Sequence, residues 1–425
     1  MESQLPSDEA SPLLDTSAID ARDAFHRSNH LVWRIAAAMY SFVVLGFFTS
    51  SVGVMLRPIS QHYSLNDLKV SLIFVVGPAG YVIAAQSSNA IHGGWGQRGI
   101  AFLAPILHIL SAGVIAVHPP FGIVLVAFAA QYMGTGLLDG SWCAWAGSMS
   151  NANTISGFLH GSFSVGAAAG PFLASIIMSV GHKPWFYWYF VLIAASVMEL
   201  IILLSAFRHQ NAARYRRGKP VDRASTRSNS NTRAIFNHLG TWLCALYFLA
   251  YVGTETAISG WVVSFMVRSR NATPYLASLA SSGFWAGMAL GRFALGAVTD
   301  RLGVGRATII YFICTIFTQV LFSIVRLPVA SIAFMAMVGF FMGPMFPSGV
   351  VVLTRLIPKE LHIPAVSFVA SVGQVGAALL PFGIGAVIQG LGISIFRYAI
   401  IVLSTIALLV WIAFSYLRII TNNFA

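Results

Sequence analysis

Three acidic residues lie inside long apolar stretches of this sequence, and their side chains are the best suited to carry chemistry. Asp139, Glu199 and Glu255 are each flanked by runs of Leu, Ile, Val, Phe, Ala and Gly. An apolar surrounding disfavours the charged form of a carboxyl group, so such an acid can take up and release a proton. We expect Asp139 and Glu255 to couple to protons, with a structural ion pair as the alternative. Glu199 lies near the end of its stretch, and we expect it at a membrane interface close to Arg208.

Several polar and aromatic side chains are candidates for contacting a small solute. Amides and imidazoles offer hydrogen bonds, and indole rings offer flat apolar faces, which together suit a hydroxyl-rich ligand. The candidates in or near the apolar stretches are Asn89, Gln131, Trp142, His160, Trp261, Trp285 and Gln374. Helix packing is the alternative role for each of them. Arg292 could neutralise a buried acid, hold an anionic substrate or extend to the membrane surface.

The motifs of the common enzyme classes do not occur in the sequence. It contains no H-E-x-x-H, no G-x-S-x-G and no nucleotide-binding G-x-x-x-x-G-K-[ST] loop. The three cysteines, Cys143, Cys244 and Cys314, give neither a disulfide framework nor a metal-ligand spacing. We therefore expect a protein that is not an enzyme, without a metal, a cofactor or a nucleic-acid partner.

These residues must be positioned by elements that cross a membrane. The chain is 57% hydrophobic and 9% charged, with a mean hydropathy of +0.77, whereas soluble domains carry about 25% charged residues. Apolar runs long enough to span a bilayer recur near 33–56, 69–91, 99–117, 121–145, 153–180, 185–207, 239–267, 275–298, 305–326, 329–354, 363–388 and 394–417. The sequence predicts an all-α polytopic membrane protein with twelve transmembrane helices in two six-helix halves.

Charge marks the boundaries between the parts of the chain. We expect a disordered cytoplasmic tail over 1–32, which holds six of the thirteen acidic residues, then one half over 33–207 and the other over 239–417. A basic linker with eight Lys and Arg covers 208–238, and a short tail covers 418–425. Of the Lys and Arg other than Arg292, 17 fall on the linker's side of the predicted topology and seven on the other.

The charge asymmetry places both termini in the cytoplasm. The linker could also bind anionic lipid, although setting the topology accounts for its charge. Glu9 with Leu13 and Leu14 has the spacing of an acidic dileucine sorting signal, so the plasma membrane and a vacuolar or endosomal membrane are both open.

Glycine positions indicate an internal duplication. Gly46, Gly53, Gly80, Gly96 and Gly136 recur 207 positions later as Gly253, Gly260, Gly287, Gly303 and Gly343. The run Val165 to Ala168 with Pro171-Phe172 recurs 210 positions later as Val375 to Ala378 with Pro381-Phe382. Duplicated halves are typical of transporters whose substrate site lies between the repeats.

The loop after the eighth predicted span resembles the loop signature of the major facilitator superfamily. Its residues Gly296, Asp300, Arg301, Gly303 and Arg306 fit G-x-x-x-D-R-x-G-x-x-R. The resemblance implies a latch at the cytoplasmic surface. In the first half the equivalent stretch has Gly93-Gly94 in place of Asp-Arg and keeps Arg98, so we expect an asymmetric latch.

Three further runs resemble the fucose–proton symporter group and its fungal relatives of the bypass-of-stop-codon type. They are GTGLLDGSWC at 134–143, YVGTE at 251–255 and FMGPMFPSG at 341–349. The resemblance implies a proton-coupling role for Asp139. Two positions depart from that group's pattern: the first span, around Thr49 to Ser51, lacks an acid, and Cys143 replaces an Asn.

From these observations we expect a secondary transporter that moves a small, sugar-like or other neutral solute by alternating access with protons as coupling ion. The expected partners are that solute and the lipid bilayer, and we expect a monomer. The spacing of Gly157, Gly166, Gly170 and Pro171 resembles the signature of drug–proton antiporters, so export of a drug-like compound or secondary metabolite is one alternative. A transporter-like sensor that no longer transports is the other.

Overall fold

Helices make up almost all of the structure, a computed structural model that describes residues 13–149, 152–218, 235–358 and 361–423. In the first half the helices are α1 (Leu13–His62), α2 (Asp67–Val70), α3 (Leu72–Trp95), α4 (Gln97–Ala116), α5 (Phe121–Gly147), α6 (Ala152–Ser175) with a π-helical turn at Ile176–Val180, and α7 (Tyr187–Phe207). The linker holds α8 (Ala212–Gly218) and a 3-10 turn at Ile235–Asn237. In the second half they are α10 (Leu239–Arg270), α11 (Pro274–Ala294), α12 (Gly296–Leu302), α13 (Val304–Ile324), α14 (Pro328–Met342), α15 (Met345–Leu356), α16 (His362–Leu391), a 3-10 turn at Ile393–Ile395, and α17 (Phe396–Asn423).

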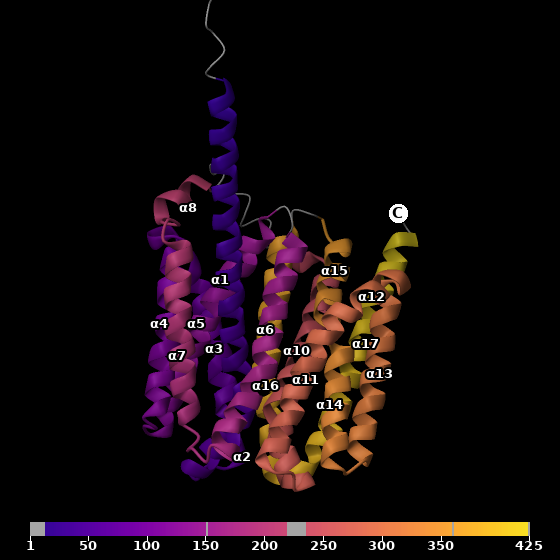
Figure 1. The fold of residues 1–425 in the computed structure, drawn as a ribbon. Helices are drawn as coiled ribbons and strands as arrows, with labels where there is room; N and C mark the ends of the chain where they lie inside the picture. The colour runs from indigo at the N-terminus through magenta and orange to yellow at the C-terminus, as the bar shows by residue number, and fades with distance from the viewer. Residues whose placement is uncertain (1–12, 150–151, 219–234, 359–360, 424–425) are drawn as a thin grey trace, which may run out of the picture.

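The helical architecture follows from the apolar runs, because a helix satisfies every backbone hydrogen bond within its own segment. Eleven helical segments of the described residues are long and apolar enough to cross a membrane. The twelfth predicted span is α11, which has 21 residues but carries several Ser and Gly and one Arg. It packs between α6 and α14 within the bundle (Figure 1). The predicted all-α fold in two halves is confirmed.

The two halves repeat the same packing. In the first half α1 packs on α6, α3 on α5, and α4 on α7; in the second α10 packs on α16, α11 on α14, and α13 on α17. Figure 1 shows the first half in indigo to magenta on one side of the bundle and the second in orange to yellow on the other. Helices α6 and α11 meet between them.

The duplicated glycines lie where two helix backbones touch. A Cβ on Gly80 of α3 would overlap the carbonyl of Ala129 in α5, and one on Gly287 of α11 would overlap the carbonyl of Ala336 in α14. Both the glycines and their partners are separated by 207 positions. Glycine permits this close approach because it has no side chain, so the repeat in sequence is also a repeat in packing.

The bundle has two distinct ends. We call the end that carries α8, α12 and α15 the linker side and the opposite end the α2 side (Figure 1). On the linker side α1 extends well beyond the other helices, because it begins at Leu13. The sequence analysis expects a disordered tail to residue 32; residues 13–32 are instead helical, and Ala18, Ala21 and Ala24 are strong helix formers. Residues 1–12 lie outside the described part of the chain.

Candidate functional site

Asp139 of α5 is held by two neighbouring donors. The Tyr81 hydroxyl of α3 donates to Asp139 Oδ2 at 2.6 Å, and the thiol of Cys143, one helical turn along α5, donates to Oδ1 at 3.4 Å. All three side chains are half-buried. The carboxyl group is thus largely withdrawn from solvent but still reachable, which a group that exchanges protons requires.

His160 of α6 extends this network toward the second half. Its Nε2 lies 3.9 Å from Cys143 Sγ. Its ring packs edge-on against Phe42 of α1 with centroids 5.8 Å apart, and it lies 6.3 Å from the ring of Phe346 in α15. Because α1 and α15 belong to different halves, the imidazole sits at the boundary between them.

Arg292 of α11 crosses that boundary. Its Nη1 donates to the hydroxyl of Ser164 at 2.7 Å and to the carbonyl of His160 at 3.3 Å, both in α6. Its charge also acts on the imidazole of His160 and on the carboxyl group of Glu255. Of the roles left open by the sequence, the geometry favours an internal one, since the guanidinium points into the bundle.

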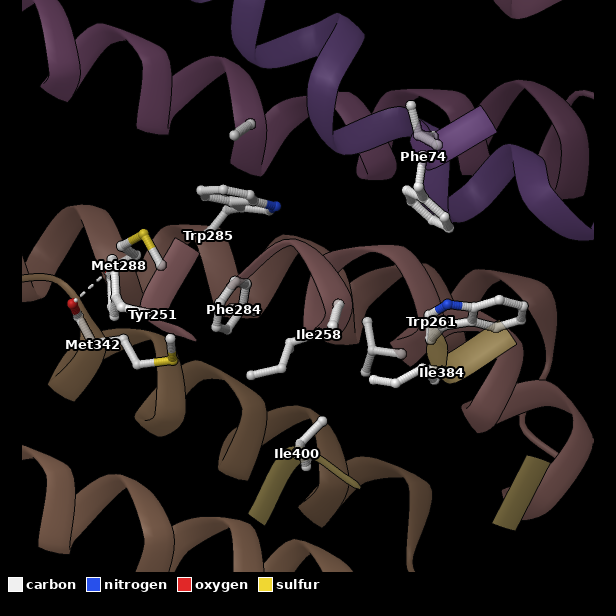
Figure 2. Packing of buried hydrophobic residues seen from close by; sticks show 14 of the residues in the cluster. Phe74, Tyr251, Ile258, Trp261, Phe284, Trp285, Met288, Met342, Ile384 and Ile400 are labelled. Carbon is white, nitrogen blue, oxygen red and sulfur yellow. Dashed lines mark hydrogen bonds between the residues drawn. The ribbon is translucent and has the colours of Figure 1, made fainter. Parts of the chain in front are cut away.

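Glu255 of α10 lies on the second-half side of the same network. The carboxyl group is within electrostatic reach of Arg292 and of the Tyr251 hydroxyl, one turn earlier. Tyr251 donates its proton to the carbonyl of Met342 at 3.1 Å, which fixes the ring against the end of α14 (Figure 2). Each half therefore contributes one carboxyl group, and a basic side chain stands near each of them at the boundary. We call Tyr81, Asp139, His160, Glu255 and Arg292 the central network.

The three indole candidates each have a packing or hydrogen-bonding partner within the protein. Trp142 is fully buried within the first half and stacks on Phe207 at 4.3 Å. The indole of Trp285 donates to Ser259 at 3.0 Å, and that of Trp261 donates to the Pro381 carbonyl at 2.9 Å.

The amide candidates differ in how exposed they are. Gln131 is buried in α5 and Gln374 is half-buried in α16. Asn89 is exposed near the linker side and lines a pocket there. Of the seven candidates, only His160 lies in the central network. The sequence analysis did not find Tyr81, whose partner Asp139 is 58 positions away.

Glu199 does not lie where the sequence analysis expects it. Its side chain is fully buried, with Oε2 at 3.0 Å from His108 Nδ1 of α4. The Thr135 hydroxyl of α5 lies 3.4 Å from the other imidazole nitrogen. A buried carboxyl group needs such a partner, so Glu199 belongs to the interior of the first half and not to an interface near Arg208.

The predicted latch lies on the linker side. Gly296, Asp300 and Arg301 belong to the short helix α12, and Gly303 ends it with a φ of 81° that favours glycine. Arg306 follows at the start of α13 and is exposed, as are Asp300 and Arg301. In the described ranges, ion pairs within 4.0 Å form only at Arg268–Asp67 and His108–Glu199. The latch residues therefore form no ion pair in this conformation.

In the first half the linker contacts the corresponding loop. The Arg98 amide donates to the Gln210 carbonyl at 3.0 Å. The Arg216 guanidinium of α8 donates to the Gly93 carbonyl at 2.8 and 3.1 Å, where the second half would have its Asp-Arg. The linker therefore contacts the first-half loop at the position equivalent to the Asp-Arg of the second half, and the asymmetric latch stays a prediction.

The halves close against each other on the α2 side. Arg268 at the end of α10 donates to both carboxylate oxygens of Asp67 at 2.7 and 3.1 Å, and Gln389 of α16 accepts from the Asp67 amide at 3.0 Å. Deeper in the bundle, the rings of Phe74 and Trp261 face each other with centroids 6.3 Å apart (Figure 2). We call these five residues the α2-side seal.

Several known proteins are similar to this chain in sequence. Residues 243–422 match the family model of the Major Facilitator Superfamily. The chain is 27% identical over 85% of its length to bypass of stop codon protein 6 of Saccharomyces cerevisiae, covering 78% of that protein. It is 26% identical over 62% of its length to the glucose/mannose transporter GlcP of Bacillus subtilis, covering 65% of it.

Solved structures agree on the fold. A mutant of the nucleoside transporter NupG superposes with a TM-score of 0.73 at 12% identity, covering 90% of this chain and 99% of the other. A D-xylose–proton symporter superposes with a TM-score of 0.72 at 10% identity, covering 90% and 97%. The family model over residues 243–422, the curated relatives and the shared fold agree with one another: the chain is similar to members of the Major Facilitator Superfamily.

Proposed function

We propose that this protein is a secondary transporter that carries a sugar-like or other small neutral solute across a membrane. It does so by alternating between two conformations, with protons as the coupling ion. The observation that carries the proposal is the central network: Asp139 from one half and Glu255 from the other flank His160 and Arg292 at the boundary between the halves. A group that binds a proton there is placed to change the contacts between the halves.

We propose that proton binding is coupled to the conformational change through the charges of the central network. The guanidinium of Arg292 holds α11 to α6 through Ser164 and the His160 carbonyl, and Glu255 lies within electrostatic range of it without forming an ion pair. Neutralising a carboxylate in this low-dielectric setting removes an attraction that would be weak in water. Protonation of Glu255 therefore changes the electrostatic surroundings of Arg292, and protonation of Asp139 changes those of His160, the two basic side chains at the boundary.

The closed α2 side supports alternating access. Toward that side a Cβ on Gly53 of α1 would overlap the Ser259 carbonyl of α10, and Gly385 of α16 lies against Ser71, the residue between α2 and α3. A solute bound at the central network could leave on that side only after the α2-side seal opens. We propose that the linker side is cytoplasmic, because it carries the excess of Lys and Arg.

The sugar-like solute is proposed from the relatives and from the polar groups of the network. The matched Bacillus subtilis protein is a glucose/mannose transporter, and one superposed structure is a D-xylose–proton symporter. Hydroxyl, imidazole and carboxyl groups around Asp139 and His160 suit hydroxyl-rich ligands.

The glycines of α6 that resemble the antiporter signature also have a packing role. A Cβ on Gly166 would overlap the carbonyl of Val43 in α1, and Gly170 lies against Ser50 of the same helix. The duplicated Gly376 of α16 approaches Leu249 of α10 in the same way. Close packing accounts for these glycines in both halves, so they do not favour export.

Transport assays in liposomes test the proposal. The protein would be reconstituted with a trapped pH-sensitive dye and exposed to hexoses, pentoses and amphipathic drugs. We expect a sugar to acidify the lumen with wild-type protein, and Asp139→Asn to reduce this to the protein-free signal because an amide cannot bind the proton. Arg355→Gln, an exposed residue of α15, is the matched control and should behave like wild type.

Three results of that assay are informative. Sugar-tracer uptake without acidification would contradict proton coupling. Acidification that survives Asp139→Asn would remove Asp139 from the proposal. A signal with drugs and none with sugars would replace the proposed solute class by the export alternative.

A further inference from the structure

A separate pocket opens on the linker side of the first half, apart from the central network. Its volume is about 650 Å³, within the range of sites for small organic molecules. It lies between the linker-side ends of α3 and α5 and the segment that leads into α8. Asp139 and Cys143 of α5 contact Tyr81 and His160, whereas Ser141, Trp145 and Ser148 of the same helix line this pocket.

The lining of the pocket carries positive charge and neutral hydrogen-bonding groups. Arg214 is its charged residue, and no acidic side chain lines it. Its other polar groups are the hydroxyls of Ser88, Ser141 and Ser148 and the amides of Asn89, Gln97, Gln210 and Asn211, with His92 and Tyr215 beside them. Such a lining suits an anion, because every group named can donate a hydrogen bond.

A second guanidinium lies next to the pocket. Arg34 of α1 stands over the ring of Trp145 at 5.8 Å, and its charge and that of Arg214 repel each other. Neither arginine takes part in the two ion pairs formed by the described residues. An anion between them would turn this repulsion into two attractions.

The segment that carries Arg214 is fixed to the first half at several points. The Asn211 side chain accepts from the Arg214 amide at 3.1 Å. Gly96, with a φ of 72°, lies so close to Gln210 and Asn211 that a Cβ would overlap their backbone. Arg216 binds the Gly93 carbonyl. The position of Arg214 relative to α3 and α5 is therefore defined before any ligand binds, which lowers the entropic cost of binding.

We propose that this pocket binds a phosphate-bearing organic anion, either the head group of a lipid or a free phosphorylated solute. The guanidinium of Arg214 in the lining, with that of Arg34 beside Trp145, supplies the positive charge that a phosphate requires, and arginine is well suited to bind its oxygens. The size of the pocket and the face of Trp145 leave room for the organic part. Because α3, α5 and the linker all line the pocket, the ligand would fasten the linker to the first half.

Binding measurements on the full chain test this inference without relying on transport. The protein would be placed in phosphatidylcholine nanodiscs and titrated with glucose 6-phosphate, with glucose as the neutral probe. A parallel series would replace part of the lipid by phosphatidic acid, and tryptophan fluorescence and melting temperature would report binding. Arg214→Gln removes the central charge, Arg214→Lys keeps it without the planar fork, and Arg355→Gln removes an exposed charge of α15 on the same side.

We expect wild-type protein to respond to at least one phosphate probe and not to glucose. Arg214→Gln should weaken the response about tenfold or more, as expected for a lost hydrogen bond to a charged group, and Arg214→Lys should lie between. A response to glucose 6-phosphate would identify a soluble ligand, and a response to phosphatidic acid alone a lipid.

Two results would overturn the inference. One is the absence of any response of wild-type protein to both phosphate probes. The other is an equal loss in Arg355→Gln and Arg214→Gln, which would mean non-specific attraction to a basic surface. If Arg214→Gln does not fold, Arg34→Gln tests the same charge from α1.

Discussion

At the residue scale, the buried acids of this chain fall into two groups with different surroundings. Asp139 and Glu255 are half-buried at the boundary between the halves, and each has a tyrosine hydroxyl nearby, Tyr81 for Asp139 and Tyr251 for Glu255. Glu199 is sealed inside one half and bound to His108. All three look alike in sequence, since each is a single acid in an apolar run. The three acids differ in the side chains that contact them. The partner of Glu199 is His108, which lies 91 positions away, so a single sequence does not identify it.

The His108–Glu199 pair leads to a prediction about stability. His108→Leu leaves the Glu199 carboxyl group buried without its partner, so the free energy of unfolding should fall by about 3–5 kcal/mol. The double variant His108→Leu/Glu199→Leu removes both polar groups and should recover most of the loss. Thermal unfolding followed by tryptophan fluorescence measures both. A single variant that melts like wild type would show that Glu199 is not held by this pair.

At the element scale, the glycines place helices in contact at matching points of the two halves. Gly80 and Gly287 bring α3 onto α5 and α11 onto α14 through backbone atoms. This contact sets how α11 presents Arg292, which lies five positions after Gly287, to α6. Glycine positions in the sequence were sufficient to predict this repeat, because only glycine permits the approach.

Two alanine substitutions in α11 test this packing. Gly287→Ala adds a methyl group that overlaps the Ala336 carbonyl, and we expect a loss of about 1–3 kcal/mol in the free energy of unfolding. Gly283→Ala, one turn earlier, meets its nearest atom at 3.5 Å, an ordinary contact, and should be neutral or slightly stabilising. Melting temperatures in detergent compare the two. Equal effects would contradict the close approach.

The membrane-spanning helices and their division into two halves could be predicted from the sequence, but some of their details could not. Runs of apolar residues fixed the spans, and the 207-residue offset fixed the pairing of the halves. The sequence does not indicate the extension of α1 back to Leu13, because an acidic polar segment is typical of disorder. In the central network the acids were found by type, whereas Tyr81 is one of many tyrosines in apolar stretches and only the fold brings it to Asp139.

At the scale of the whole molecule, the halves behave as two similar bodies joined at the centre and on the α2 side. The Asp67–Arg268 ion pair and Gln389 connect them at the surface, and Phe74 with Trp261 connects them below. The central network lies between this seal and the linker side. In the proposed alternating access the seal has to open while the centre rearranges, so we expect the seal to contribute to the balance between conformations.

Removing the ion pair of the seal should shift that balance. Asp67→Asn weakens the Asp67–Arg268 ion pair, and the buried Ser264 beside it can be replaced by cysteine as a reporter. We expect this cysteine to react with a membrane-impermeant thiol reagent about two- to fivefold faster when Asp67 is replaced. That factor corresponds to about 0.5–1 kcal/mol, which is what a partly exposed ion pair contributes. The Ser264→Cys protein with Asp67 intact is the reference. The double variant Asp67→Arg/Arg268→Asp exchanges the two charges and should restore slow labelling of the cysteine at position 264. An unchanged labelling rate in Asp67→Asn would contradict a role for the seal.

Gradient-driven accumulation of a labelled sugar tests the central claim most directly. Liposomes that contain the wild-type protein would be given an inward proton gradient, and tracer uptake would be followed with and without a protonophore. The account predicts accumulation above the external concentration that collapses when the gradient is dissipated and that Asp139→Asn abolishes. Uptake that stops at the external concentration whatever the gradient would show a carrier without proton coupling and would contradict the account.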